Sequence, residues 1–252
     1  MKALRLTGGW DAIGTSNVVP NNLKFDFLAF KRLTKLALLN VRCSPEHITS
    51  LGMVRRTLKH LQVARNALSA LDVNLSVFNY QFVQVNYCKL KSVSAILLCG
   101  AALPAADGGP GGGGAEWSSL EHLDLRHNEI SALDASLALA PSLSHLHLGG
   151  NAVAVIENLA PLTRLSVLEL ADNDVSEAAD LHAKLGAVER IDLSHNKLKS
   201  LAGFSRLYSL RHLNVAANRI KDLNSVRPVS GLPCLESLNL QGNVVTTIVD
   251  YR

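Results

Sequence analysis

The stretch IDLSHNKLKSLAGFSRLYSLRHLNVAANRIKDL, from Ile191 to Leu223, decides the fold because it almost repeats itself. Its parts IDLSHNKLKSL and LNVAANRIKDL place apolar residues, an asparagine and a lysine at matching offsets. The shared template is L-x-x-L-x-L-x-x-N, in which the fourth and sixth residues alternate with polar ones. Such alternation predicts a strand with one buried face. A unit this short cannot bury its apolar face alone, so neighbouring units must stack.

Six copies of the template follow one another in the second half of the chain, and this is the leucine-rich repeat pattern. Their asparagines step by 22 to 25 residues and are Asn128, Asn151, Asn173, Asn196, Asn218 and Asn243. An amide at this position can hydrogen-bond backbone groups that the turn after the strand leaves unpaired, so we expect a structural asparagine ladder. The predicted fold class is an α/β-type solenoid, a horseshoe with a parallel concave sheet. Its convex side is expected to hold 3₁₀ turns, irregular segments or short helices.

Weaker copies of the template lie upstream. Leu58-Leu61-Val63-Asn66 keeps every key position, Leu33-Leu36-Leu38 has Val41 in place of the asparagine, and Met1-Leu4-Leu6 resembles a strand entered halfway. Solenoids need capping repeats at their ends. No cap precedes Met1, and what reads as a closing cap stops at Arg252, so we expect a piece of a longer protein or an incomplete gene product.

The template start jumps by 62 residues between Leu58 and Leu120, which leaves roughly 40 residues more than one repeat needs. The first half of the segment from Asn74 to Trp117 alternates and predicts a stray strand, although it fits no repeat. Its second half is rich in glycine, as flexible linkers are. The segment is either a genuine inserted loop or sequence that does not belong, such as a retained intron. The predicted organisation is divergent repeats over 1–71, an insertion with linker over 72–116, and regular repeats with a truncated cap over 117–252.

Composition favours a reducing, intracellular setting. The 252 residues include four cysteines without metal-like spacing or a paired framework, whereas extracellular repeats of this kind usually carry cysteine-stapled caps. No signal peptide opens the chain, and the most apolar run, Val93 to Ala106, is too short and too interrupted to span a membrane. We therefore expect a cytoplasmic protein without direct membrane insertion.

Charge is unevenly distributed along the chain. Residues 1–70 hold eleven Lys and Arg against three Asp and Glu, a net of +8, and the remainder carries 14 against 18, a net of −4. One interpretation is an ordinary solvated surface, and the other is two electrostatic faces for different partners. Nucleic acid is not an expected partner, because the basic residues are not interleaved with aromatic ones in a known motif.

Seven of the nine histidines occupy positions between the leucines of predicted strands: His60, His122, His127, His145, His147, His195 and His212. His122, His145 and His147 are expected to approach one another across adjacent strands, which invites a metal or acid–base interpretation. No cysteine or glutamate completes a ligand set, and solvent-facing positions tolerate any polar residue. Nucleotide-binding and hydrolase motifs are also absent from the sequence. We expect no enzyme, no cofactor and no metal.

The concave face is the default functional surface of a solenoid. From Leu120 onward its template positions carry acidic Glu121, Asp124, Glu169, Asp172, Glu189, Asp192 and Glu236 against basic Arg126, Arg190 and Arg211. Either these exposed positions are simply polar, or they form a rigid surface for a protein segment with some positive charge. The candidate binding residues are Glu121, Asp124, His145, His147, Glu169, Asp172, Arg190, Asp192, Asn214 and Asn239.

Between the leucines, the sequence resembles the repeat region of the nischarin (imidazoline receptor candidate) family. The similar stretches include His182 to Gly186, Leu207 to Leu210, Gly231 to Leu235 and the closing Asp250 to Arg252, with LRLTGGWDAIGTSNVV and FDFLAFKRL near the start. The resemblance covers most of the chain except Asn74 to about Ala115. A scaffold protein that interacts with the kinase LKB is a more distant look-alike.

The resemblance implies an intracellular scaffold whose repeat surface binds an integrin alpha-subunit tail, p21-activated kinase, Rac and Rab GTPases and the kinase LKB, and which restrains cell migration. Members of that family carry a phox-homology domain for endosome targeting, which this sequence lacks. An endosomal association is therefore expected only through missing regions or through partners. The alternative function is a regulatory or inhibitory subunit of a phosphatase or a kinase.

Overall fold

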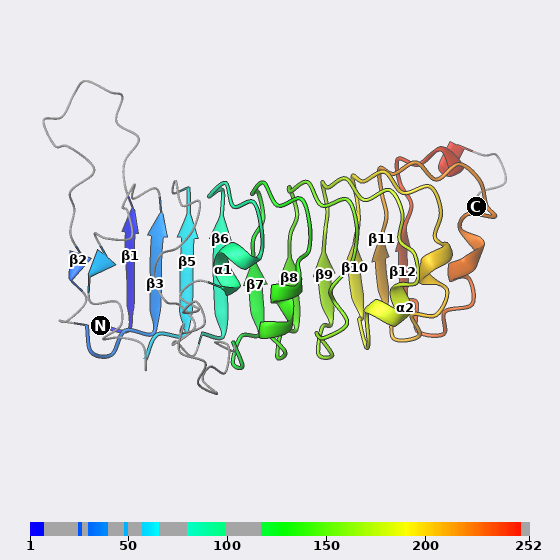
Figure 1. Ribbon diagram of the computed structural model, residues 1–252. Coiled ribbons are helices and arrows are strands. Elements are labelled where there is room, and N and C mark those ends of the chain that lie inside the picture. Colours follow the sequence, from blue (N-terminus) through cyan, green and yellow to red (C-terminus); the bar gives the residue numbers. More distant parts are fainter. Residues whose placement is uncertain are drawn as a thin grey trace, which may run out of the picture.

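A computed structural model describes residues 1–7, 25–26, 30–39, 48–49, 57–65, 80–98 and 117–247. Ten of the described strands form one sheet in which every neighbouring pair is parallel (Figure 1). In sheet order they are β1 (Ala3–Thr7), β3 (Lys35–Leu39), β5 (His60–Ala64), β6 (Phe82–Asn86), β7 (His122–Asp124), β8 (His145–His147), β9 (Val167–Glu169), β10 (Arg190–Asp192), β11 (His212–Asn214) and β12 (Ser237–Asn239). A separate pair joins β2 (Phe25–Asp26) to β4 (Ile48–Thr49). The predicted solenoid fold is confirmed.

Each strand buries one face and leaves the other partly open, as the template predicts. In β10, Ile191 at the fourth template position is buried between the more open Arg190 and Asp192, and Leu193 at the sixth position is also buried. Successive strands align template position with template position, so that Ile191 lies beside Leu168 on one side and Leu213 on the other. The buried leucines therefore form continuous rows along the solenoid.

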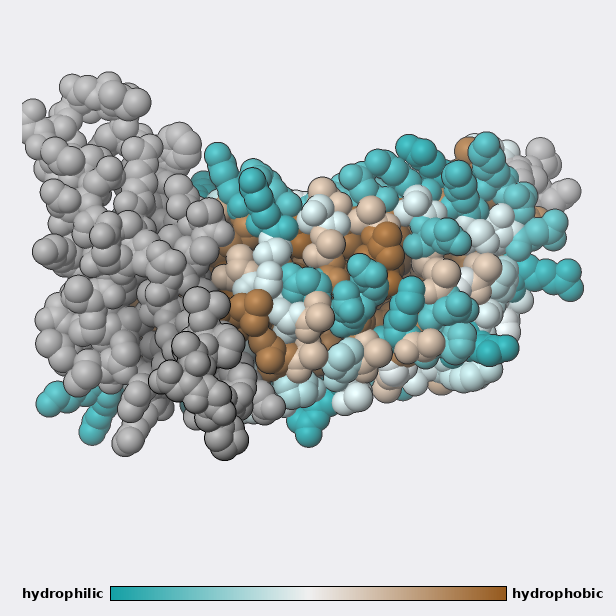
Figure 2. All heavy atoms as spheres, in the orientation of Figure 1, coloured by the Kyte–Doolittle hydropathy of each residue, from teal (hydrophilic) through white to brown (hydrophobic). Residues whose placement is uncertain are grey.

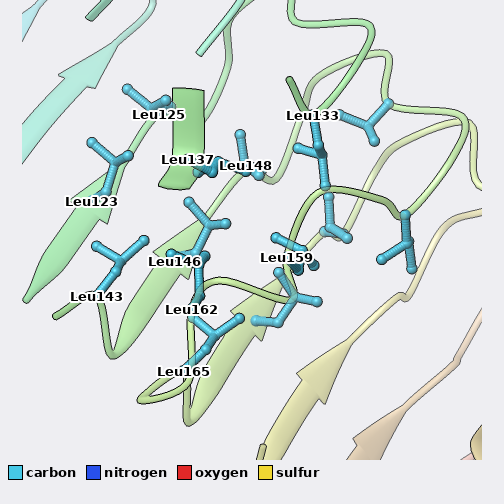
Figure 3. Packing of buried hydrophobic residues seen from close by; sticks show 14 of the residues in the cluster. Leu123, Leu125, Leu133, Leu137, Leu143, Leu146, Leu148, Leu159, Leu162 and Leu165 are labelled. Atoms are coloured by element: carbon cyan, nitrogen blue, oxygen red, sulfur yellow. The ribbon is translucent and has the colours of Figure 1, made fainter. Parts of the chain in front are cut away.

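Short turns of helix lie on the side of the sheet opposite its concave face, as predicted. They are α1 (Ser94–Leu97), η5 (Ala135–Leu139), α2 (Leu181–Lys184), η6 (Ala202–Phe204), η7 (Arg227–Val229) and η8 (Val244–Thr247), where η denotes a 3₁₀ helix. Their leucines meet those of the strands. Figure 3 shows Leu133, Leu159 and Leu162 from this side gathered around Leu146 and Leu148 of the β8 repeat, and all five are at most 1% exposed.

The interpretation that the segment from Asn74 fits no repeat is wrong for its described part. Strand β6 pairs in register with β5 and β7, and its Val83 and Val85 are fully buried. The template runs here as Tyr80, Val83, Val85 and Cys88, and Tyr80 starts 22 residues after Leu58. Tyrosine at the first position and cysteine at the ninth conceal the repeat from a search for leucine and asparagine. Because a repeat needs volume rather than one residue type at its first position, tyrosine fits.

Residues 88–98 complete this repeat and tie it to the next one. The Trp117 indole N–H donates to the Leu97 carbonyl at 3.0 Å, and its ring stacks on Tyr80 at 6.0 Å between centroids. The Asp134 carboxylate accepts from the backbone N–H groups of Ser94 and Ser136, both at 3.0 Å, and so joins α1 to η5. The glycine-rich part of the predicted insertion, with Val41 and Asn66, lies outside the described residues. A division of the chain at 71 and 116 stays a prediction.

Candidate functional site

The asparagine at the ninth template position links each repeat to the one before it. The Asn196 amide nitrogen donates to the carbonyls of Leu193 in its own repeat and Leu170 in the previous one, at 3.1 and 2.8 Å. Its oxygen accepts the Val175 backbone N–H at 2.9 Å. Equivalent bonds to the preceding repeat recur at Asn128, Asn151, Asn173, Asn218 and Asn243. The amide groups of these side chains are engaged in hydrogen bonds between repeats and are therefore unavailable to a ligand.

The eighth template position is left-handed in every described repeat from β5 to β12, a feature that the leucine pattern does not reveal. Its residues, with φ between 51° and 73°, are Arg65, Tyr87, His127, Gly150, Asp172, His195, Ala217 and Gly242. The backbone N–H at this position still bonds to the next repeat, as from Asp172 to the Ser194 carbonyl at 2.9 Å. The chain then turns away from the sheet. A left-handed residue costs about 1–2 kcal/mol unless it is glycine, and the inter-repeat bonds offset that cost.

This turn corrects the placement of three predicted residues. Asp172, expected on the concave strands, lies at their rim, where its side chain is 65% exposed and within 3.9 Å of the His195 imidazole. His127 and His195 are likewise rim residues rather than strand residues. At the rim His127 stacks on Tyr87 at 4.4 Å between ring centroids, and the Arg65 guanidinium lies 5.7 Å from the Tyr87 ring centroid.

A row of rings crosses the concave face at the third template position. His60, Phe82, His122 and His145 occupy the same position in β5, β6, β7 and β8. Their ring centroids are 5.9, 6.0 and 4.1 Å apart in that order. The predicted approach of His122 to His145 is therefore confirmed, and His147 lies 6.3 Å from His145 between ring centroids. Phe82 is the member that sequence reasoning missed, since its repeat was not recognised.

The environment of this row disfavours positive charge on two of its imidazoles. Burial lowers the pKa of His60 below its ordinary value, and the neighbouring Lys35, Lys59 and His122 lower it further. Burial also lowers the pKa of His145, with His122 and His147 adding to the effect. Both rings are thus mainly neutral at pH 7. Within the described ranges, no group of three His, Cys, Asp or Glu side chains has a geometry that would hold a metal ion.

Acidic side chains gather on the other half of the concave face, but most of them have partners. Asp124 is nearly buried and pairs with Arg126 through two hydrogen bonds of 3.0 and 2.8 Å, the main reason why the pKa of Arg126 is raised. Glu169 accepts from the His147 imidazole and lies 4.0 Å from Arg126. The predicted acidic face is therefore a network of paired charges rather than a row of free carboxylates.

Asp192 lies beside Glu169 in register and is also held in place. Its carboxylate accepts from the Ser194 backbone N–H and hydroxyl, at 2.9 and 2.7 Å, and from the Asn214 amide at 2.9 Å. Arg190, Asn214 and Asn239 lie on β10, β11 and β12, and Glu121 immediately precedes β7. Arg190, Asn239 and Glu121 are exposed. The structure brings the predicted binding residues onto one surface, with Asp172 at its rim, and their role in binding stays a prediction.

Comparison with known proteins agrees with this architecture. Residues 163–220 match a family model described as Leucine rich repeat, and residues 118–136 match a second model of the same description. The chain carries leucine-rich repeats. Two solved structures have the same repeat fold. An internalin from Listeria monocytogenes is 19% identical, with a TM-score of 0.59 and coverage of 87% of this chain and 64% of that one. The Drosophila Toll–Spatzle complex is 18% identical, with a TM-score of 0.61 and coverage of 88% of this chain and 33% of that one. At such identities they show the fold alone.

Relatives by sequence share the leucine-rich repeats over part of their length. Serine/threonine-protein kinase 11-interacting protein of Gallus gallus is 34% identical over 129 residues, which is 50% of this chain and 12% of the relative. The Homo sapiens protein is 30% identical over 163 residues, 62% of this chain and 15% of the relative. Lumican of Rattus norvegicus is 27% identical over 233 residues, which is 89% of this chain and 63% of lumican. The chain thus spans about one eighth of the length of the kinase-interacting relatives.

Proposed function

We propose that this leucine-rich repeat chain is a protein-interaction module of a signalling scaffold, without catalytic activity, that holds a segment of its partner along the concave face. One observation carries the proposal. One face of the sheet of ten described strands is buried against the leucine core, the described helical turns lie on that same side, and the other face is left open (Figure 1). Parallel sheets in proteins are usually covered on both faces. A rigid sheet with a polar face left open is suited to receive another chain.

The surface around the helical turns is a less suitable binding site. Figure 2 shows this face of the described repeats as a mixture of hydrophilic and hydrophobic residues. Its large exposed apolar side chains are scattered, as with Val155 and Tyr208, and single exposures of this kind are ordinary on protein surfaces. The concave side instead presents aligned rows of side chains, among them the row of rings at the third template position, because the repeat places each template position beside the same position of the next strand.

The kind of partner is suggested by two resemblances. The chain is similar to a protein named for its interaction with serine/threonine-protein kinase 11, which supports a protein kinase as a partner. The resemblance to the nischarin family adds an integrin alpha-subunit tail, p21-activated kinase, Rac and Rab GTPases and the kinase LKB. It also implies a cytoplasmic location, with an endosomal association through regions outside this chain. In the described residues, no helix is long and apolar enough to cross a bilayer.

The test is a charge reversal at the centre of the concave face. Glu169→Lys combined with Asp192→Lys changes two side chains that lie side by side and leaves the buried leucines unchanged. An integrin alpha-subunit juxtamembrane peptide, which is basic, should bind at least tenfold more weakly, about 1.4 kcal/mol, when measured by calorimetry. Wild-type binding of the peptide should also weaken as salt rises, since screening shortens the reach of surface charges.

The matched control reverses two exposed glutamates on the opposite side, Glu157→Lys with Glu177→Lys. It makes the same change in net charge and should leave binding within twofold of wild type. Purified serine/threonine-protein kinase 11 is the second ligand, and its kinase activity is measured in the same mixtures. Changed activity would favour the alternative role as a regulatory subunit. If both ligands bind all three proteins equally, the concave face is not the binding surface.

A further inference from the structure

The concave face has a hollow at its amino-terminal end that the acidic network does not reach. We call it the amino-terminal hollow. It measures about 530 Å³ and is bounded by Ala3, Arg5, Lys35, Ala37, His60 and Phe82. The strand register explains why it forms. Ala3 lies beside Lys35, and Ala37 lies beside Arg5, so each long cationic side chain has an alanine as its neighbour. The alanines leave room where other repeats place larger side chains.

The walls of the hollow differ in character. One wall is aromatic, because Phe82 stands next to His60 with their rings tilted by 40°. His60 offers an uncharged ring, since burial and the nearby Lys35 and Lys59 lower its pKa. The other wall is cationic, because Arg5 and Lys35 are both exposed. A planar apolar group can stack on the rings while an anion next to it meets the cations.

Positive charge predominates around the hollow, and Asp26 on β2 is the one acidic residue among the described residues before Glu121. The described residues in 1–7, 30–39, 57–65 and 80–98 include no aspartate or glutamate. Their basic residues are Lys2, Arg5, Lys31, Arg32, Lys35, Lys59, Arg65, Lys89 and Lys91. Glu169 and Asp192 stand five and six strands away from β3, roughly 24–29 Å at about 4.8 Å per strand. That separation exceeds the Debye length of about 8 Å at physiological salt, so the two ends of the face act independently.

We propose that the amino-terminal hollow binds an acidic segment of a partner protein in which an aromatic side chain stands next to carboxylates. The aromatic ring would enter between the alanines and stack on Phe82 and His60, and the carboxylates would pair with Arg5 and Lys35. The proposal rests on the proposed function, in that the concave face receives a protein segment, and it adds the chemistry that one end of the face selects.

A protein segment fits better than a single-stranded nucleic acid, which also combines flat rings with negative charge. A nucleic acid needs a continuous basic groove for its backbone. From β7 onward the face carries Asp124, Glu169 and Asp192 at neighbouring strand positions, so the basic surface of the hollow does not continue along it. A peptide can be acidic at the hollow and neutral or basic further along the face, as these charges require.

The experiment selects peptides from a phage-displayed random library on the folded chain. Selected peptides are synthesised with a fluorophore, and their binding is measured by polarisation at about 0.15 M salt, a physiological ionic strength. The enriched sequences should place Asp or Glu next to Trp, Phe or Tyr. Arg5→Glu with Lys35→Glu should weaken their binding at least tenfold. Lys31→Glu with Arg32→Glu reverses one lysine and one arginine outside the hollow and should change binding less than twofold.

A second variant tests shape without charge. Ala37→Leu fills the hollow and should weaken the same peptides at least fivefold, while circular dichroism confirms that each variant is folded. Enriched peptides that lack acidic or aromatic residues, or that bind all these variants like wild type, would overturn the proposal. So would tighter, Arg5- and Lys35-dependent binding of a labelled oligothymidylate than of any peptide. Peptides that lose binding only with Glu169→Lys and Asp192→Lys would overturn this inference and leave the proposed function standing.

Discussion

At the scale of single residues, the scaffold depends on side chains that complete backbone hydrogen bonds between repeats. Asn196 is 7% exposed and bonds to four backbone groups in two repeats. Cys88 stands at the same template position, and its thiol reaches the Asn86 carbonyl at 3.2 Å. A thiol sulfur is a much weaker acceptor than an amide oxygen, so cysteine supplies chiefly the donor function of asparagine.

Replacing Asn196 with alanine should lower the free energy of unfolding by about 1–3 kcal/mol, since the buried Val175 N–H loses its acceptor and the Leu170 and Leu193 carbonyls each lose one of their two amide donors. The measurement is a urea titration followed by circular dichroism. Asn239→Ala is the control, because that exposed side chain accepts only from the Gln241 backbone N–H among the described contacts. It should cost about 0.5 kcal/mol or less. Equal midpoints for the two variants would refute the account of the asparagine ladder.

Gly203 lies where no larger residue fits, whereas Gly231 lies where a side chain would have room. A Cβ at Gly203 would lie 1.4 Å from the Ala178 carbonyl oxygen, whereas a Cβ at Gly231 would meet nothing within 4 Å. Because the obstacle is backbone, Gly203→Ala must shift η6 away from the preceding repeat and should cost about 3 kcal/mol or more. Gly231→Ala should be neutral or stabilise by up to about 1 kcal/mol. Thermal melts of both variants check this, and similar melting temperatures would contradict it.

At the scale of elements, β6 joins the two ends of the sheet. Its carbonyls and N–H groups pair with β5 and β7, and removal of the strand would leave each neighbour without one of its two partner strands and would divide the sheet. A stray strand or an intron-derived segment would instead exchange its amide hydrogens freely. The central position of β6 thus makes it an element of the core.

Hydrogen exchange should show the amides of β6 protected to within tenfold of those in β7. The physical reason is that both strands sit inside the same ladder, where exchange requires the sheet to open. The measurement is exchange at pH 7 followed by mass spectrometry of peptides covering 80–90 and 118–128. Full exchange of the β6 peptide within seconds, with the β7 peptide still protected, would show that this strand is not part of the sheet.

At the scale of the whole molecule, the row of rings couples stability to pH. The folded-state pKa values of His60 and His145 are lowered, so the unfolded chain binds more protons near the ordinary value of 6.5. The stability that these neutral rings contribute is fully present above the unfolded value of about pH 6.5 and should be lost as the pH falls from there through the lowered folded-state pKa. The groups facing them are Lys35, Lys59, His122, His147 and Phe82.

His145→Gln should therefore flatten the decline in the urea midpoint between pH 7.5 and 5.5. His182→Gln, at an exposed position on α2, is the control and should leave the slope unchanged. Comparison of slopes removes the contributions of every other titrating group, because those are common to the proteins. A steeper decline in His145→Gln than in wild type would show that this imidazole gains rather than loses protons on folding.

The spacing of leucines along the chain is enough to predict the repeat, the parallel sheet and the alternation of buried and open positions. Leu168, Ile191 and Leu213 recur at a regular spacing because each of these apolar residues must pack against its equivalent in the neighbouring repeat. The placement of Glu169 beside Asp192 results from the same register. Features that depend only on the period and the polarity of the chain were therefore predictable from the sequence.

Which side chains at open positions remain available for binding depends on contacts made in the folded protein. Asp124 is buried by its pairing with Arg126, and Asp172 turns to the rim because its backbone is left-handed. The repeat of β6 was also hidden, since packing accepts Tyr80 and Cys88 where the pattern expects leucine and asparagine. The amino-terminal hollow arises from alanines on two strands 32 residues apart in register. Such features depend on contacts between side chains of different repeats. A sequence template describes the residues of a single repeat and therefore does not contain these contacts.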